Sequence, residues 1–479
     1  MESKEPRVVI FPFMAKGHTI PLLDLSKALS CKGLKITIIT TPSNSPFILQ
    51  STSNHPKIHT VELEFPIVEG LPKGCENTDQ LPSMDLYVPF VRATEQLQRP
   101  FEQLLHQMSN GQDLPIFVIS GFFLGWTLDV CNIFDVPQLV FHGAGAFALS
   151  ASKSLTVHAP HKHVCRDDEP FKVPRLPTTT RLTLADLPRR LKLLDPTADP
   201  FAKFIMEVHD SDVDSWGVIV NSFVEMEGDY VPALESFYRN GAKVWCVGPI
   251  LLYKEVEDAE ETRDAEAPNK YRASKCMEWL DKRSTSPCSV IYVSFGTQTH
   301  ISNAQLDEVA LGLEISCQPF IWVVRSITWS PPDGMEERIK ERGLIIREWA
   351  PQRQILAHPA IGGFLSHCGW NSVLESISGG VPILAWPMIA EQRLNAKFVV
   401  DELQAGVKIV GCTGAEEGTI IGRGVICKGV EELMGKDRGR RFRGRVKELS
   451  RAARQAVHEG GSSDKRLDEM INCLINRAK

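Results

Sequence analysis

The densest group of polar and aromatic residues lies between Trp349 and Gln392. Inside it, an apolar run ends at Leu365 and a turn of small and polar residues follows over 366–369. The pattern then predicts a helix over 371–378 that two glycines end. A helix start presents backbone N–H groups and the positive end of the helix dipole. These residue types in this order therefore predict a site for an anion.

Ser372 and Glu375 in the same stretch allow a second interpretation. Their S-x-x-E spacing is that of a capping box, in which two side chains satisfy backbone N–H groups at the start of a helix. On that interpretation both residues are purely structural. The spacing alone leaves the two alternatives open.

His18 is the candidate for proton transfer. It follows Gly17, after an apolar run over 7–13 that predicts the first strand. Histidine changes its charge near neutral pH, so one placed at the carboxyl end of a strand can act as a general base. The alternative is a histidine packed into the core.

Two further patterns indicate chemistry less strongly. Gly143, Gly145 and Ala148 match a dinucleotide-binding fingerprint, but they follow about the fifth predicted strand rather than the first, which favours close packing instead. The stretch over 158–165 has the composition of a metal cluster, but its spacing fits no standard closed site; it contains His158, His161, His163 and Cys165.

The composition excludes several classes of function. With 53 basic and 59 acidic side chains the net charge is -6, and no long basic run offers a nucleic-acid surface. Residues 2–6 are polar or proline, so we expect no signal peptide, and no run of 18 apolar residues predicts a membrane span. The twelve cysteines form no C-x-x-C pair. We therefore expect a cytoplasmic protein with reduced thiols.

Short apolar runs must position the residues named above. Helix-length segments, such as 22–30 and 83–106, separate one apolar run from the next. They predict strands over 7–13, 35–40, 58–63, 116–120, 138–141, 217–221 and 244–247, and again over 289–295, 320–325, 344–347, 362–365, 382–386 and 407–410. Unbroken apolar strands alternating with helices indicate parallel sheets covered on both faces. The predicted fold class is α/β, with two doubly wound sheets in tandem and a cleft at the carboxyl ends of their strands.

The predicted domain boundaries follow changes in composition. We expect an N-terminal domain over 1–248, an acidic linker over 249–274 and a C-terminal domain over 275–458. Residues 459–479 contain a predicted helix from Asp464 to Arg477, whose apolar face must dock on another element.

The stretch from Trp349 to Gln392 closely resembles the signature box of the plant family 1 UDP-dependent glycosyltransferases, which move sugars from UDP-sugars to small molecules. The resemblance extends to FPFMAKGHTIPLLDLS near the N-terminus and to VSFGT over 293–297, so it covers essentially the whole chain. It implies a GT-B fold, that is, two Rossmann-like domains facing across a cleft. The first would bind the acceptor, the second the UDP-sugar, and the last helix would pack back on the first.

The resemblance also implies a role for each matching residue of the second domain. Trp349 would stack on uracil, Ala350 and Gln352 would meet its polar edge, and Glu375 would bind the ribose hydroxyls. The diphosphate would leave without help from a metal, stabilised by His367, Asn371, Ser372 and Thr297. The hexose would be held by Trp370, Glu391 and Gln392. A closing glutamine is typical of glucose donors, so the implied co-substrate is UDP-glucose, with no cofactor.

In this family the residue that matches His18 is the general base, and an aspartate orients it where this chain has Gly121. The base deprotonates an acceptor hydroxyl that attacks the anomeric carbon in one inverting step. Without the carboxylate, His18 should be a weaker base, so we predict phenolic rather than aliphatic acceptors and a gain in rate for Gly121→Asp. Asp129 and Asp85 are the nearest candidates to take the aspartate's place. Gly143 similarly replaces a frequent threonine.

The expected activity is inverting, UDP-glucose-dependent O-glucosylation of a small aromatic plant metabolite by a monomer. The predicted acceptor wall lies at the strand ends of the first domain and comprises Phe13, Met14, Phe90, Gly121, Phe122, Phe123 and His142. Two alternatives stay open at this point. One is C-glucosylation of an electron-rich phenol, and the other is UDP-sugar binding with little catalysis.

Overall fold

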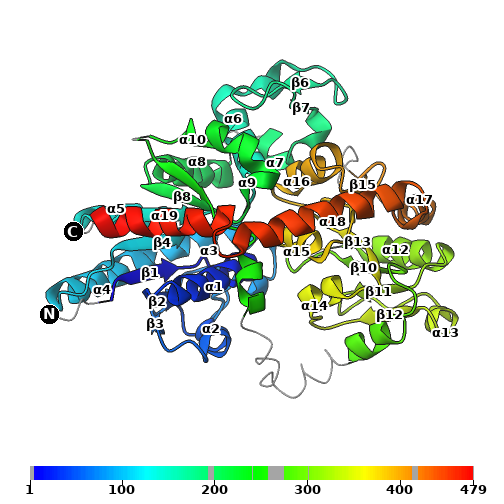
Figure 1. The fold of residues 1–479 in the computed structure, drawn as a ribbon, viewed down its shortest axis with the longest axis horizontal. Helices are drawn as coiled ribbons and strands as arrows, with labels where there is room; N and C mark the ends of the chain where they lie inside the picture. The colour runs from blue at the N-terminus through cyan, green and yellow to red at the C-terminus, as the bar shows by residue number, and fades with distance from the viewer. Residues whose placement is uncertain are drawn as a thin grey trace. The chain divides into compact units, whose positions relative to one another are not determined.

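The computed structural model describes residues 5–192, 199–239, 241–256, 275–299, 301–412 and 419–477. They group into two compact units, each built on its own parallel sheet (Figure 1). The first unit lies within Met1–Lys153, Leu193–Val256 and Ala456–Lys479, and the second lies within Ser154–Lys192 and Glu257–Gln455.

The sheet of the first unit has seven parallel strands among the described residues. In spatial order they are β3 (Ile58–Glu62), β2 (Lys35–Thr40), β1 (Arg7–Phe11), β4 (Phe117–Gly121), β5 (Gln138–Phe141), β8 (Gly217–Val220) and β9 (Lys243–Cys246). The strand order reverses between β1 and β4, which is the switch point of a doubly wound fold. Residues that follow β1, β4 and β5 therefore meet at one edge of the sheet, and they include His18, Phe122 and His142.

Helices cover both faces of this first sheet. They are α1 (Lys16–Cys31), α2 (Ser45–Thr52), α3 (Tyr87–Thr94), α4 (Gln98–Asn110), α5 (Thr127–Ile133), α6 (Ala146–His158), α8 (Pro200–Val213), α9 (Val224–Glu227), α10 (Val231–Glu235) and α19 (Ser462–Arg477). One core joins α1, α2 and α19 to Val8 and Ile10 of β1, whereas the other joins α3, α4, α5 and α8 to Val9 and Phe11. The alternation along β1 is that of a strand buried on both faces.

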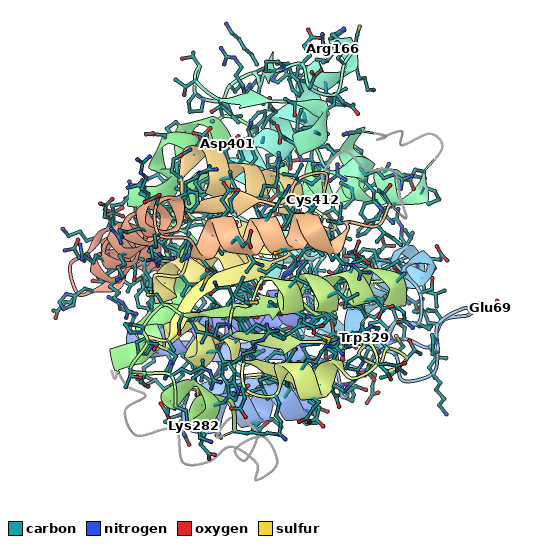
Figure 2. All side chains as sticks on the ribbon, turned by 90° about the vertical axis from the view of Figure 1, so that its right-hand side faces the viewer. Glu69, Arg166, Lys282, Trp329, Asp401 and Cys412 are labelled. Carbon is teal, nitrogen blue, oxygen red and sulfur yellow. The ribbon has the colours of Figure 1, made fainter. Side chains whose placement is uncertain are left out.

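The sheet of the second unit has six parallel strands among the described residues. Their spatial order is β12 (Gly343–Ile346), β11 (Phe320–Val323), β10 (Val290–Ser294), β13 (Ile361–Ser366), β14 (Ile383–Ala385) and β15 (Gly406–Lys408). Trp329, labelled in Figure 2, packs on Trp322 of β11 with 5.0 Å between ring centroids. The helices of this unit are α7 (Arg189–Lys192), α12 (Asn303–Ile315), α13 (Met335–Ile339), α14 (Gln352–Ala357), α15 (Trp370–Gly379), α16 (Gln392–Lys397), α17 (Arg423–Met434) and α18 (Arg438–Val457).

Each predicted strand is confirmed to within two residues at either end. The segment over 83–106 is interrupted, because two short 3₁₀ turns, η2 (Met84–Leu86) and η3 (Glu95–Leu97), flank α3. Pro100 has no N–H to donate to the carbonyl of Gln96, so the helical hydrogen bonding cannot run unbroken through this point. The α4 helix starts afresh at Gln98.

Residues 154–192 group with the second unit, although they precede the predicted boundary at residue 248. They carry the ribbon β6 (Phe171–Lys172) with β7 (Arg181–Leu182) and the turn η5 (Leu184–Asp186). The predicted linker also starts later than residue 249. Residues Ile250–Val256 form η7, whose Ile250 is buried in the first unit because it is large and apolar. The rest of the linker, residues 257–274, lies outside the described residues.

The α19 helix packs on the first unit through Leu467, Met470, Ile471 and Leu474. Ser463 Oγ donates to the carbonyl of Gly248 at 2.6 Å, and Asp464 pairs with Lys32 of α1 at 2.6 Å. The apolar spacing of this helix predicted that it docks. Within the described parts of the chain, no helix is long and apolar enough to cross a membrane.

Candidate active site

The turn between β13 and α15 has an unusual backbone conformation. Cys368 is fully buried, and its φ of 62° lies in the left-handed region that residues other than glycine rarely adopt. Its N–H donates to Ser366 Oγ at 3.1 Å, and its carbonyl accepts from Asn395 Nδ2 at 3.0 Å. These bonds fix the start of α15, where Gly369 is the N-cap and no side chain bonds as a cap. The predicted anion site is therefore a preorganised helix start.

His367 lies within this turn, in a slot between two glycines. A Cβ atom on Gly296 would lie 2.6 Å from His367 Nε2, and one on Gly369 would lie 2.5 Å from it, so neither position accepts a side chain. Burial lowers the pKa of His367 to about 4. The ring is therefore neutral at physiological pH and can act as a hydrogen-bonding group, not as a cation. Thr297 follows Gly296 in the facing loop.

Ser372 and Glu375 are tied to Gln352, not to the start of their own helix. Gln352 Nε2 donates to Ser372 Oγ at 3.0 Å and to Glu375 Oε2 at 2.6 Å. Arg353 Nε donates to Glu375 Oε1 at 3.1 Å. The capping-box interpretation is wrong, because Ser372 is three residues past the N-cap. A carboxylate has about four acceptor positions, so Glu375 is held in place and can still accept from ribose hydroxyls.

The two tryptophans of the box differ in exposure. Trp349 is 50% exposed, and the Arg325 guanidinium lies 5.4 Å from the centroid of its ring. Trp370 is 2% exposed and packs on Phe398 at 6.3 Å between centroids. An exposed indole offers a face on which a flat base can stack. The Trp370 side chain is a core residue, so the hexose contact predicted for it can come only from its backbone.

Glu391 and Gln392 stand at the start of α16. Gln392 Oε1 accepts from the N–H groups of Met388 and Ile389 at 3.0 and 2.9 Å, which fixes its amide against the preceding loop. Burial raises the pKa of Glu391, whose Oε1 accepts from Asn395 Nδ2 at 3.2 Å. Asn395 thus contacts both this residue and the turn before α15. All eleven predicted donor-site residues lie in the second unit.

His18 lies in the first turn of α1, against an aromatic wall. Its ring centroid is 5.6 Å from that of Phe13 and 5.5 Å from that of Phe123, both edge to face. Its Nδ1 atom is buried and makes no hydrogen bond to any described residue. Burial lowers the pKa of His18 to about 4, and the nearby His142 contributes to the shift. His18 is therefore a neutral imidazole at physiological pH, and a weak base.

Gly121 is required by the close approach of the backbone of Phe13. A Cβ atom at residue 121 would lie 2.8 Å from the amide nitrogen of Phe13 and 3.0 Å from its Cβ. The geometry therefore argues against the gain in rate predicted for Gly121→Asp, because a side chain there requires the Phe13 backbone to shift. The proposed replacements do not fill the role either, since Asp129 and Asp85 are both exposed.

The predicted acceptor wall divides into core and accessible residues. Phe13, Met14 and Phe90 are at most 3% exposed, and they belong to the core of the sheet face. Phe122 and Phe123 are partly exposed. The wall also contains two aromatic residues that the sequence reasoning missed, because Phe123 contacts Tyr87 at 6.0 Å and Phe204 at 6.4 Å between centroids.

A buried polar cluster behind His142 was also missed. Asp212 accepts from Lys153 Nζ at 2.5 Å and from the Tyr238 hydroxyl at 2.9 Å, and it lies 2.9 Å from His142 Nε2. Burial alone would raise the pKa of Asp212, but His142 and Lys153 hold it well below its usual range. The sequence signal that could have revealed this cluster is Asp212 itself, an acidic residue eight positions after Phe204 on the apolar face of α8.

His142 is the link between this cluster and the acceptor wall. Its ring stacks on Phe122 at 4.5 Å between centroids, and Phe122 in turn contacts Phe123. Gly143, the next residue, has a φ of 74°, and a Cβ atom there would lie 3.5 Å from His18 Nδ1. His18 and His142 are thus neighbours across one edge of the sheet.

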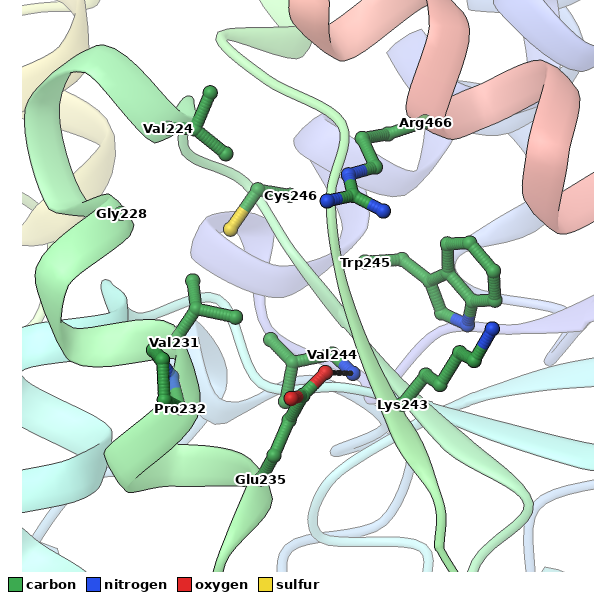
Figure 3. A pocket seen from close by; sticks show the side chains of 10 residues that line it. All are labelled: Val224, Gly228, Val231, Pro232, Glu235, Lys243, Val244, Trp245, Cys246 and Arg466. Carbon is green, nitrogen blue, oxygen red and sulfur yellow. Dashed lines mark hydrogen bonds between the residues drawn. The ribbon is translucent and has the colours of Figure 1, made fainter.

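Other features of the chain lie apart from these residues. A pocket of about 320 Å³ in the first unit opens between α9, α10 and β9, with Cys246 and Arg466 among the lining residues (Figure 3). It includes no predicted site residue. Among the described residues, no three His, Cys, Asp or Glu side chains are grouped so that they could hold a metal ion.

Comparisons with known proteins give consistent results. The family model described as UDP-glucoronosyl and UDP-glucosyl transferase matches residues 261–416, and that described as glycosyltransferase, N-terminal domain, matches residues 5–251. A scopoletin glucosyltransferase of Nicotiana tabacum is 40% identical over 95% of this chain and 94% of its own length. A UDP-glucose flavonoid 3-O-glucosyltransferase of Fragaria ananassa is 39% identical, covering 100% of this chain and 98% of its own.

A crystal structure gives the same result for the fold. The Glycyrrhiza uralensis protein solved with glycyrrhetinic acid 3-O-monoglucuronide superposes with a TM-score of 0.86 at 33% identity, covering 99% of this chain and 96% of the other.

Proposed function

Because the chain belongs to the plant UDP-glycosyltransferase family, with its GT-B fold, we propose that it transfers glucose from UDP-glucose to the hydroxyl group of a phenol. Transfer of a glycosyl group from a UDP-sugar follows from the family. The choice of glucose, the acceptor class and the residue roles are the substance of the proposal.

At the donor end, each contact uses a group whose position is fixed by the second unit. Trp349 stacks on uracil, and Glu375, anchored by Gln352 and Arg353, binds the ribose. The start of α15 faces the diphosphate together with His367, Asn371, Ser372 and Thr297. These groups stabilise the negative charge that builds up on UDP as it departs. Glu391 and Gln392 hold the hexose.

At the acceptor end, the observation that carries the proposal is the environment of His18. Burial, together with the nearby His142, lowers its pKa to about 4, compared with 6.5 for an ordinary histidine, and its Nδ1 has no hydrogen-bond partner among the described residues. Protonating this ring therefore costs about 3 kcal/mol more than protonating an exposed one. A phenol gives up its proton far more readily than an alcohol does, so it demands less of the base. The acceptor oxygen then attacks the anomeric carbon from the face opposite to UDP, with inversion.

The aromatic wall and the relatives support the same acceptor class. Phe123 beside His18, and Phe122 in contact with Phe123, offer partly exposed flat apolar surface, and the buried Tyr87 and Phe204 pack behind Phe123. Scopoletin and flavonoids, named for the two relatives, are phenolic.

The test is a set of acceptors of similar shape whose hydroxyl acidity differs. UDP-glucose is supplied with phenols of pKa about 7 to about 10 and with a benzyl alcohol, and products are identified by mass spectrometry. We expect O-glucosides that acid hydrolyses, rates that fall as acceptor pKa rises, and little product from the alcohol. His18→Ala should abolish turnover.

Other outcomes contradict the proposal in distinct ways. Products that resist acid would indicate C-glucosylation. Tight UDP binding without turnover on any acceptor would indicate a donor-binding protein. Equal rates on the phenol and the alcohol would show that His18 is not limited as a base.

A further inference from the structure

The η5 turn contains a buried carboxylate that belongs to the second unit. Asp186 is 4% exposed and accepts from the N–H of Thr183 at 3.0 Å and from its hydroxyl at 2.9 Å. This reciprocal bonding locks the four-residue turn. Both bonds go to Oδ2, so Oδ1 keeps its acceptor positions for partners on other elements.

Those partners come from the elements that end beside the turn. Lys397, the last residue of α16, lies 3.4 Å from Asp186 Oδ2, and Lys408, the last residue of β15, lies 3.6 Å from Oδ1. The Lys397 side chain is only 16% exposed. Arg393 Nη1 adds a contact of 3.4 Å to the carbonyl of Ala185. One carboxylate therefore joins the turn, the end of α16 and the end of β15.

The α16 helix depends on such contacts. It has six residues and continues directly into a π-helical turn, Phe398–Glu402; even together they are shorter than an isolated helix needs to be stable, so their position is set by tertiary contacts. At its other end stand Glu391 and Gln392, with Ala390 before them at a φ of 49°. A small rotation of α16 about its anchored end would displace both of these side chains.

We propose that Asp186 is a positioning residue for the donor sugar. Through Lys397 and Lys408, the turn from residue 183 to residue 186 sets the orientation of α16, and thereby the places of Glu391 and Gln392. A segment from the first half of the chain thus completes the hexose end of the donor site. The inference rests on the proposed role of Glu391 and Gln392 in holding the hexose.

The test measures recognition of the hexose separately from recognition of the nucleotide. In Asp186→Asn, KM for UDP-glucose should rise by roughly ten- to a hundredfold, the scale expected when reacting groups are displaced by about 1 Å. The inhibition constant of UDP should stay within about twofold, because the hydrogen bonds and ion pairs of Asp186 lead to Thr183, Lys397 and Lys408 and so to the hexose end of the site. Preference for UDP-glucose over UDP-galactose should narrow, since the two differ only at one hexose hydroxyl.

Asp401→Asn is the matched control. Asp401 is exposed, is labelled in Figure 2, and pairs with the same Lys397 at 2.7 Å. Asp401→Asn should leave the KM for UDP-glucose, the inhibition constant of UDP and the preference for UDP-glucose over UDP-galactose unchanged. If Asp186→Asn does not fold, Lys408→Met removes one of the two cations while the Lys397 pair stays, and it should give a smaller rise in KM of the same kind.

Several results would overturn the proposal. If Asp186→Asn weakened the binding of UDP and of UDP-glucose equally, Asp186 would have a general structural role. If folded Asp186→Asn and Lys408→Met both kept the parent's KM for UDP-glucose, Asp186 would have no role in positioning the sugar. Gln392→Ala tests the premise separately. If it leaves KM for UDP-glucose unchanged, the assignment of the hexose residues fails under the proposed function, and this inference fails with it.

Discussion

Under the proposed function, His18 accepts a proton without a carboxylate at residue 121, because the backbone of Phe13 occupies the space into which a side chain there would extend. The glycine at residue 121 is thus coupled to the packing of the segment after β1 against the end of β4. A single substitution at residue 121 cannot undo this packing. The carboxylate of the region is Asp212, and it bonds to His142 instead.

Gly121→Asp should destabilise the protein and should not raise its rate. Forcing atoms into a filled site costs about 1 to 3 kcal/mol, so the thermal midpoint should fall by several degrees. Gly17→Ala is the control for stability, because a Cβ atom there meets nothing within 4 Å. A folded Gly121→Asp protein with higher kcat on weakly acidic acceptors would show that the Phe13 backbone yields easily.

The pH profile of kcat/KM reports on His18 directly. A pKa of about 4 leaves the base neutral throughout the neutral range, so a phenol with pKa near ~10 should give a flat profile between about pH 5.5 and 7.5. An ordinary histidine would give an acid limb near 6.5. Observation of that limb would mean that His18 is better solvated during turnover than the structure indicates.

At the scale of elements, the proposed function gives the start of α15 the task of stabilising the departing diphosphate, which a metal ion performs in other enzymes. Its backbone N–H groups and dipole act together with the neutral His367 and the side chains beside it.

Turnover should therefore persist in EDTA. The measurement is the initial rate with UDP-glucose after dialysis against chelator, with and without added Mg²⁺ or Mn²⁺. We expect rates within about twofold of one another, since charge stabilisation by helix ends and hydrogen-bond donors needs no ion. Loss of activity on chelation that Mg²⁺ restores would refute this account of the leaving group.

Elements of this fold differ in how far they can be predicted from the sequence. The strands are predictable because each is an unbroken apolar run buried on both faces, as in Val290–Ser294. The helix start at Trp370 is predictable to one residue, but the partners of Ser372 and Glu375 are not. Those partners come from Gln352, some twenty residues away, and only tertiary structure brings them together.

The same limit applies at the acceptor side. His18 and Phe123 follow strands whose adjacency is a rule of parallel sheets, so their proximity was expected. The tight approach of Phe13 to Gly121, and the cluster at Asp212, depend on distances across the fold that no spacing in the sequence encodes. The grouping of residues 154–192 with the second unit is likewise a tertiary fact.

At the scale of the whole molecule, the first unit buries several ionisable groups that make its stability depend on pH. His18 and His209 both have pKa values lowered to about 4 by burial, so the unfolded state binds their protons more readily. Their contribution raises stability as the pH rises from 4 to 6.5. Glu227 acts in the opposite direction. It is 1% exposed, and burial raises its pKa to about 7 while the N–H of Phe147 donates to its Oε1 at 2.8 Å.

Glu227→Gln should reveal this opposing contribution. The folded state keeps the Glu227 proton up to pH 7 while the unfolded state releases it above 4.5, so this group lowers stability as the pH rises through that window. The amide has no proton to lose and can still accept from Phe147. The stability of the variant relative to the parent should therefore rise by about 2 to 3 kcal/mol between pH 5 and pH 8. Denaturant unfolding at the two pH values measures it, and the histidine contributions cancel in the comparison. A difference that does not change with pH would mean that Glu227 ionises normally in the folded protein.

The docking of α19 also has a consequence for synthesis of the chain. Leu467, Met470 and Leu474 complete a core whose other side chains come from the strands of the first sheet and from α1, α2 and η7, all of which precede the second sheet in the sequence. During translation, the face of this core that α19 covers therefore stays exposed until residues 462–477 have been made, after the second sheet. Chaperones that hold exposed apolar surface are expected to engage the nascent chain over this interval. A message that stops anywhere before Ser462 would leave that face exposed for good and direct the product to aggregation or degradation.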